Sequence, residues 1–124
     1  MEKFLMIGVG AVAGALCRHW VSLWSAQKLG THFAYGTLFV NLIGSFALGL
    51  FLGLHLDKGL FTPNLRYLVA VGFCGSFTTY STFSWETLRY FQEGNFKLAA
   101  VYLTLTLAGC LVGAWAGMTL AKAL

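Results

Sequence analysis

The stretch GSFTTYSTFS, residues 75–84, decides how this chain is read. Six of its ten residues are Ser or Thr, and a seventh, Tyr80, carries a phenol. It lies within residues 67–85, which contain no Asp, Glu, Lys or Arg and are long enough to cross a membrane as a helix. The presence of so many hydroxyl groups in an otherwise apolar segment needs a physical explanation.

The whole chain has the composition of a membrane protein. Of its 124 residues, 58% are hydrophobic and 10% are charged, and the mean hydropathy is +0.74. Soluble domains carry about 25% charged residues, and a soluble domain of this length could not bury so much apolar surface. Four segments are long and apolar enough to cross a bilayer, at about 4–24, 37–56, 67–85 and 98–121. We therefore expect an all-α membrane protein, with a single four-helix transmembrane domain over residues 1–124.

The third segment contains signals for a break near its middle. Gly72 and Gly75 weaken a helix there, and the Ser and Thr hydroxyls that follow compete for backbone hydrogen bonds. In a membrane, irregular backbone is tolerated only where protein buries it or where it lines a wet cavity. A break between Gly75 and Thr79 would free carbonyls such as those of Gly75 and Thr78, which suit a hard cation. The alternative is a continuous helix whose hydroxyls bond to its own carbonyls, and these residues alone favour neither.

Uncharged groups that can face an anion accompany this segment. Asn41 is the single Asn within an expected membrane segment, and Tyr102 and Thr106 share a helix face because they lie four residues apart. Tyr80 and Phe83 also share a face, and the edges of aromatic rings carry partial positive charge. Weak donors of this kind hold an anion without trapping it as a full charge would. Each also has a simpler interpretation, because amides bond between helices and aromatic pairs usually pack in cores.

The basic residues do not orient the chain in a membrane. With four membrane segments, one side carries Lys3, Lys58, Arg66 and Lys122, and the other carries Arg18, Lys28, Arg89 and Lys97. Orientation follows an excess of Lys and Arg on the cytoplasmic side, and here four stand against four. Either the balance is chance in a small count, or the chain inserts both ways up and forms an antiparallel dual-topology homodimer.

Glycines recur four residues apart, in the pairs 10/14, 49/53, 109/113 and 113/117. Such pairs give a helix a flat face on which another backbone can approach closely. Packing within one chain and a tight dimer both use this spacing, so the pairs do not separate the two.

Other function classes find little support. No acidic residue lies deep in an expected membrane segment, which counts against a proton-driven exporter. No nucleophile with a paired base, metal-ligand cluster or phosphate loop indicates an enzyme, and the scattered Lys and Arg do not indicate nucleic-acid binding. Arg18, near the end of the first segment, either extends its charged end to the interface, or forms a positive vestibule or a structural packing anchor.

Three motifs carry a resemblance over essentially the whole chain: GTLFVN at 36–41, GFCGSFTTYSTFSWE at 72–86 and TLAGC at 106–110. Together they resemble the Fluc family of fluoride-specific ion channels. The resemblance implies a passive channel that exports fluoride across a bacterial inner membrane. It also implies a multi-pass protein that assembles as an antiparallel dual-topology homodimer with two pores.

The resemblance further implies roles for individual residues. A structural Na+ that is not transported would be held at the dimer centre by the backbone carbonyls of Gly75 and Thr78, where the third helix is broken near its middle. The fluoride pathway would be lined by Asn41, Tyr80, Phe83, Ser81, Thr82, Tyr102 and Thr106, and the family's first-segment arginine matches Arg18.

One position departs from the family pattern. The usual sequence is TTFSTF, and this chain has Tyr80 in place of the first Phe. The added phenol puts the conduction rate in question, whereas the fold and the dimer should survive it. Two other functions remain as alternatives: a small dual-topology exporter of cationic drugs, and a purely structural dimeric membrane subunit.

Overall fold

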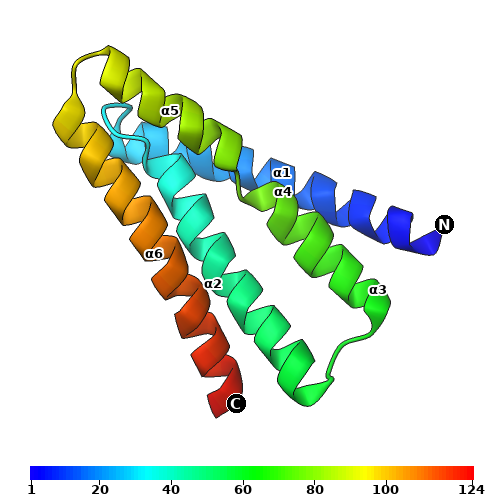
Figure 1. Ribbon diagram of the computed structural model, residues 1–124. Coiled ribbons are helices and arrows are strands. Elements are labelled where there is room, and N and C mark those ends of the chain that lie inside the picture. The colour runs from blue at the N-terminus through cyan, green and yellow to red at the C-terminus, as the bar shows by residue number, and fades with distance from the viewer.

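The computed structural model describes residues 1–124, and the chain consists of helices joined by short loops, without strands. Three helices are continuous: α1 (Glu2–Leu29), α2 (Tyr35–Lys58) and α6 (Phe96–Ala123). Each is long and apolar enough, by length and composition, to cross a membrane. In Figure 1, α2 and α6 lie side by side, and the segments between them in sequence form a fourth, interrupted path. The all-α prediction is confirmed.

The interrupted path corresponds to the third expected membrane segment. It consists of α3 (Pro63–Arg66), a π-helix η1 (Tyr67–Cys74), α4 (Gly75–Phe77) and α5 (Tyr80–Gln92). Helical geometry stops after α4 because Thr78 and Thr79 are extended, with φ/ψ of −86°/159° and −151°/124°. The predicted break is confirmed at this point. The π-helix before it was not expected, and the sequence pattern contains no signal that distinguishes it from an α-helix.

Glycine allows the helices to approach one another closely. α2 packs mainly on α6, and α1 packs mainly on η1. A Cβ on Gly49 or Gly117 would overlap the backbone of the opposite helix, and one on Gly10 or Gly14 would overlap the backbone of η1. The glycine pairs therefore serve packing within one chain.

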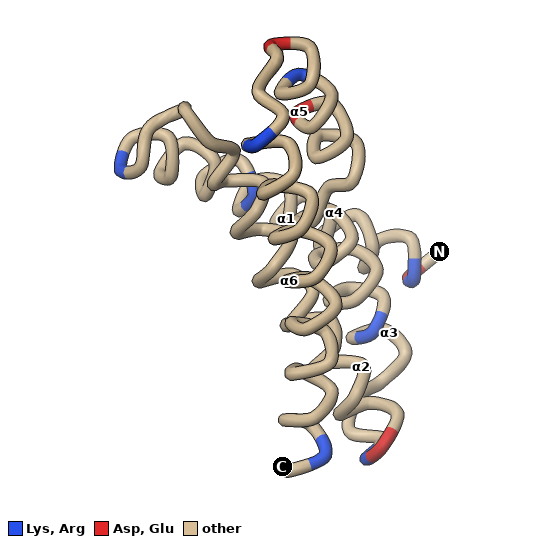
Figure 2. Tube along the Cα trace, turned by 60° about the vertical axis from the view of Figure 1, so that its left-hand side comes forward, with Lys and Arg blue, Asp and Glu red and all other residues tan.

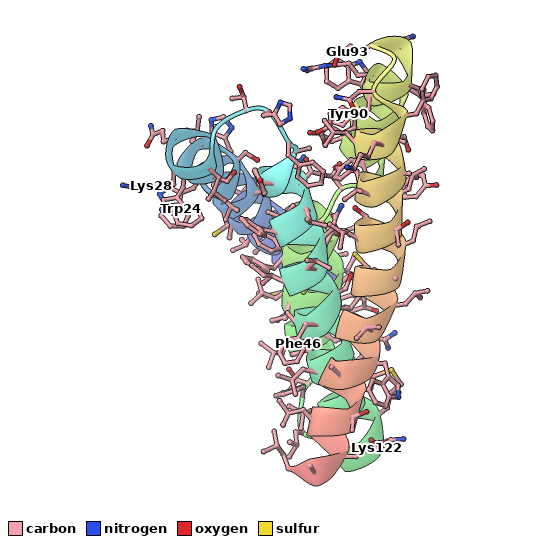
Figure 3. The ribbon with its side chains drawn as sticks, turned by 90° about the vertical axis from the view of Figure 1, so that its left-hand side faces the viewer. Trp24, Lys28, Phe46, Tyr90, Glu93 and Lys122 are labelled. Carbon is pink, nitrogen blue, oxygen red and sulfur yellow. The ribbon has the colours of Figure 1, made fainter.

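The surface is largely apolar. Only 24 of the 124 residues are buried, so most large hydrophobic side chains face outward. Figure 2 shows most of the Lys, Arg, Asp and Glu toward the ends of the helices, with long uncharged stretches between them. In Figure 3, Trp24 and Lys28 lie together at the end of α1, and Glu93 and Lys122 mark opposite ends of the molecule. This distribution fits a multi-pass protein surrounded by lipid.

Candidate functional site

Side chains satisfy the backbone where the third segment breaks. The Thr79 N–H donates to Asn41 Oδ1 at 2.8 Å, and Asn41 Nδ2 donates to the Thr79 carbonyl at 3.0 Å. Thr79 Oγ1 accepts from the Thr82 N–H at 3.3 Å, so Thr79 caps α5. Before the break, the Thr78 hydroxyl donates to the Cys74 carbonyl at 2.9 Å. The break is therefore an ordered structure held by specific hydrogen bonds.

Arg18 connects α1 to the same place. Its Nε donates to the Ser76 carbonyl at 3.1 Å, one residue before the end of α4. The last carbonyls of a helix carry partial negative charge and lack helical partners, so a guanidinium stabilises them. Arg18 thus has a defined contact at the break, away from the charged ends of the molecule.

A groove of about 370 Å³ lies beside the break, between α2, α5 and α6. Its lining includes five of the residues singled out from the sequence: Asn41, Thr78, Tyr80, Phe83 and Thr106. Phe83 is buried at 5% exposure, whereas Tyr80 is 77% exposed. Thr106 is 5% exposed, and its hydroxyl has no hydrogen-bond partner in the chain. An unpartnered buried hydroxyl in a groove is available to a bound ligand.

Tyr102 lies next to the groove, behind Phe83. The centroids of these two rings are 5.2 Å apart, and the Tyr102 hydroxyl donates to Glu86 Oε1 at 3.1 Å. Tyr102 is fully buried because Phe33 and Tyr90 also pack against it, with centroids at 5.4 and 5.7 Å. Figure 3 shows Tyr90 on α5 near the end of the molecule that carries Glu93. Tyr102 is thus part of a rigid aromatic cluster that continues from the groove toward that end.

Besides Tyr102 and Arg18, three further predicted residues do not line the groove. Ser81 and Thr82 lie in the first turn of α5 and belong to the capping structure, with Ser81 Oγ 3.5 Å from Thr79 Oγ1. Gly75 is exposed at the start of α4.

Two contacts at the site, those of Thr79 and Glu86, were not predicted from the sequence. Thr79 lies directly before α5, and a Thr at that position is an N-cap signal that could have singled it out. Glu86 had no comparable signal, because its partner Tyr102 lies on another helix.

Comparison with known proteins identifies the chain. Residues 5–118 match the family described as "CrcB-like protein, Camphor Resistance (CrcB)". The chain belongs to the CrcB-like family. CrcB-like relatives named "Fluoride-specific ion channel FluC" include one from Citrifermentans bemidjiense, 40% identical over 124 residues, and one from a Sulfurihydrogenibium species, 43% identical over 124 residues. Both alignments cover the whole of both chains.

A further CrcB-like relative with the same name, from Trichormus variabilis, is 40% identical over 117 residues, which are 94% of this chain and 77% of the relative. The resemblance carried by the three motifs is confirmed. These relatives are named as channels, in agreement with the prediction that the CrcB-like chain is not an enzyme.

Proposed function

We propose that this CrcB-like protein is a passive channel that exports fluoride across a bacterial inner membrane. The observation that carries the proposal is the groove at the break, which Thr106, with its buried and unpartnered hydroxyl, lines together with Tyr80 and Phe83. Relatives that match the full chain at 40–43% identity are named for this activity. The groove offers hydroxyls, an amide and aromatic rings, and no charged side chain lines it.

Weak donors suit fluoride for a physical reason. Fluoride is small and strongly hydrated, so a path must replace its water molecules one by one without binding the ion too tightly. The Thr106 hydroxyl and the Tyr80 phenol can donate, and the Tyr80 and Phe83 rings meet edge to face with centroids 5.8 Å apart. The Tyr102 hydroxyl lies beyond Phe83, but its single proton is donated to Glu86 Oε1, so it adds no free donor to this path.

The proposed assembly is an antiparallel dual-topology homodimer with two pores. Two observations support it: apart from Arg18 at the break, the Lys and Arg residues are divided four against three between the two expected sides, and Tyr80 is 77% exposed beside the groove. A narrow ion path needs walls all round, and a second copy in the opposite orientation would close the groove. The same assembly would cover part of the exposed apolar surface.

A structural sodium ion at the dimer centre is part of the proposal. The Gly75 and Thr78 carbonyls lie on either side of Ser76 and Phe77, and neither accepts a hydrogen bond beyond the regular helical ladder. Backbone carbonyl oxygens are suitable ligands for a hard cation, so the residues fit the ion. One chain supplies two such oxygens, and a two-fold pair of chains supplies four, which is closer to what such a cation requires.

The experiment that tests the channel uses liposomes that contain only this protein. Loaded with fluoride, they should release it rapidly to a fluoride electrode, and liposomes loaded with chloride should retain it. A protein that releases both anions, or neither, contradicts the proposed function. The alternative of a cationic-drug exporter gains nothing from the structure, because no carboxylate lines the groove.

A further inference from the structure

Two N–H groups at the break bond to side chains where a continuous helix would use carbonyls. In an α-helix each N–H donates to the carbonyl four residues earlier. The Thr79 N–H would therefore reach Gly75, and the Thr82 N–H would reach Thr78. Instead, Thr79 donates to Asn41 Oδ1 at 2.8 Å, and Thr82 donates to Thr79 Oγ1 at 3.3 Å. The two carbonyls that lose their helical donors are the two proposed as sodium ligands.

We infer that Asn41 and Thr79 are positioning residues, which keep the Gly75 and Thr78 carbonyls free by binding the N–H groups that would otherwise occupy them. The inference rests on the proposed function, because the carbonyls matter only if they hold a cation. It gives Asn41 a task at the break in addition to its place in the groove, and it gives Thr79 a role that the motif comparison did not assign.

The Asn41 side chain is well placed for this task. It is 7% exposed and lies on α2, so it can hold the break from a separate helix. Its amide serves both polar groups around Thr79, since Oδ1 accepts from the N–H and Nδ2 donates to the carbonyl at 3.0 Å. Without this amide, the Thr79 N–H would be unsatisfied in an apolar surrounding, and the Gly75 carbonyl is the acceptor that helical geometry offers.

Thr79 acts in the same way on the second half of the break. Its Oγ1 donates its own proton to Thr82 Oγ1 at 3.0 Å, which leaves a lone pair for the Thr82 N–H. A side chain of the same shape without oxygen would leave that N–H to the Thr78 carbonyl. Replacing the Asn41 amide would therefore remove the Gly75 carbonyl from the proposed ion site, and replacing the Thr79 hydroxyl would remove the Thr78 carbonyl.

The test measures how sodium changes the thermal stability of the purified full-length protein. Unfolding temperatures are compared in sodium chloride and in N-methylglucamine chloride at equal ionic strength. An ion that binds only the folded state raises the unfolding temperature, so a sodium site should appear as a difference between the two salts. The variants are Asn41→Leu and Thr79→Val, which lose the acceptor, and Thr79→Ser, which keeps it. Thr87→Val is the matched control, since its hydroxyl bonds to the Phe83 carbonyl on the same helix at 2.8 Å, away from the break.

We expect sodium to raise the unfolding temperature of the wild type, Thr79→Ser and Thr87→Val equally. The rise should fall to about half or less in Thr79→Val and disappear in Asn41→Leu. If Asn41→Leu does not fold, the comparison of Thr79→Val with Thr79→Ser tests the inference on its own. A full sodium effect in Thr79→Val overturns the inference alone. A wild type without any sodium effect overturns the sodium site and the inference together, while fluoride efflux still decides the channel.

Discussion

At the scale of single residues, Tyr80 is the side chain with the most direct influence on conduction. Its ring is 77% exposed beside the groove and pairs with Phe83, and its phenol is a donor that the family's usual Phe lacks. One additional hydrogen bond to an anion contributes about 1.5–3 kcal/mol, which corresponds to a factor of about ten to a hundred in ion residence. Tyr80→Phe should therefore raise fluoride efflux from liposomes by about that factor and leave the elution volume of the purified protein unchanged. Equal efflux from both proteins would show that the phenol does not contact the ion.

At the scale of elements, close packing of helices depends on particular glycines. A Cβ on Gly117 would overlap the Phe46 carbonyl across the α2–α6 contact, whereas a Cβ on Gly8 meets nothing within 4 Å. Gly117→Ala should destabilise the protein by about 1–3 kcal/mol, since overpacking forces backbones apart. Gly8→Ala should be neutral or stabilise by up to about 1 kcal/mol, because alanine favours a helix. Thermal unfolding of both variants checks this pair, and equal losses of stability would contradict the packing described here.

The elements also show what a sequence can predict in such a protein. Hydropathy located the membrane segments, because apolar length is a local property. Gly72, Gly75 and the hydroxyl run signalled a break but left a continuous helix equally open, and the family resemblance favoured the break. The helices extend further than expected, as α1 runs over Glu2–Leu29 against the predicted 4–24. The π-helix and the bonds from Asn41 to Thr79 could not be predicted, because they depend on how separate helices meet. Thr106 was noted for its helix face, but its lack of a partner emerges only from the fold.

At the scale of the whole molecule, the balanced Lys and Arg residues lead to a prediction about orientation. Leu60 lies in the loop between α2 and α3, and Gln92 ends α5 on the opposite side of the expected membrane. Leu60→Lys and Gln92→Lys should bias insertion toward opposite orientations, because a small excess of Lys and Arg on one side places that side in the cytoplasm. Each variant alone should lose fluoride efflux, and co-expression of the two should restore it, since an antiparallel pair needs both orientations. A tag that a protease reaches from one side only would show that a variant inserts in one orientation. Full fluoride efflux from each such variant alone would contradict the antiparallel dimer.

The central claim is that fluoride passes through the groove at the break, and one comparison tests it most directly. Fluoride efflux from liposomes is measured for the wild type, Thr106→Val and Thr119→Val. Both substitutions remove a hydroxyl from α6, but Thr106 faces the groove without a partner, whereas the Thr119 hydroxyl already donates to the Trp115 carbonyl at 2.8 Å. The Thr106 hydroxyl would replace water on fluoride inside the groove, whereas the exposed Tyr80 phenol adds a donor that the family's usual Phe lacks and so lengthens residence. Loss of the Thr106 donor would raise the barrier by about 1.5–3 kcal/mol, so Thr106→Val should slow efflux at least about tenfold and Thr119→Val should leave it unchanged. Equal efflux from the wild type and Thr106→Val would contradict a fluoride path through this groove.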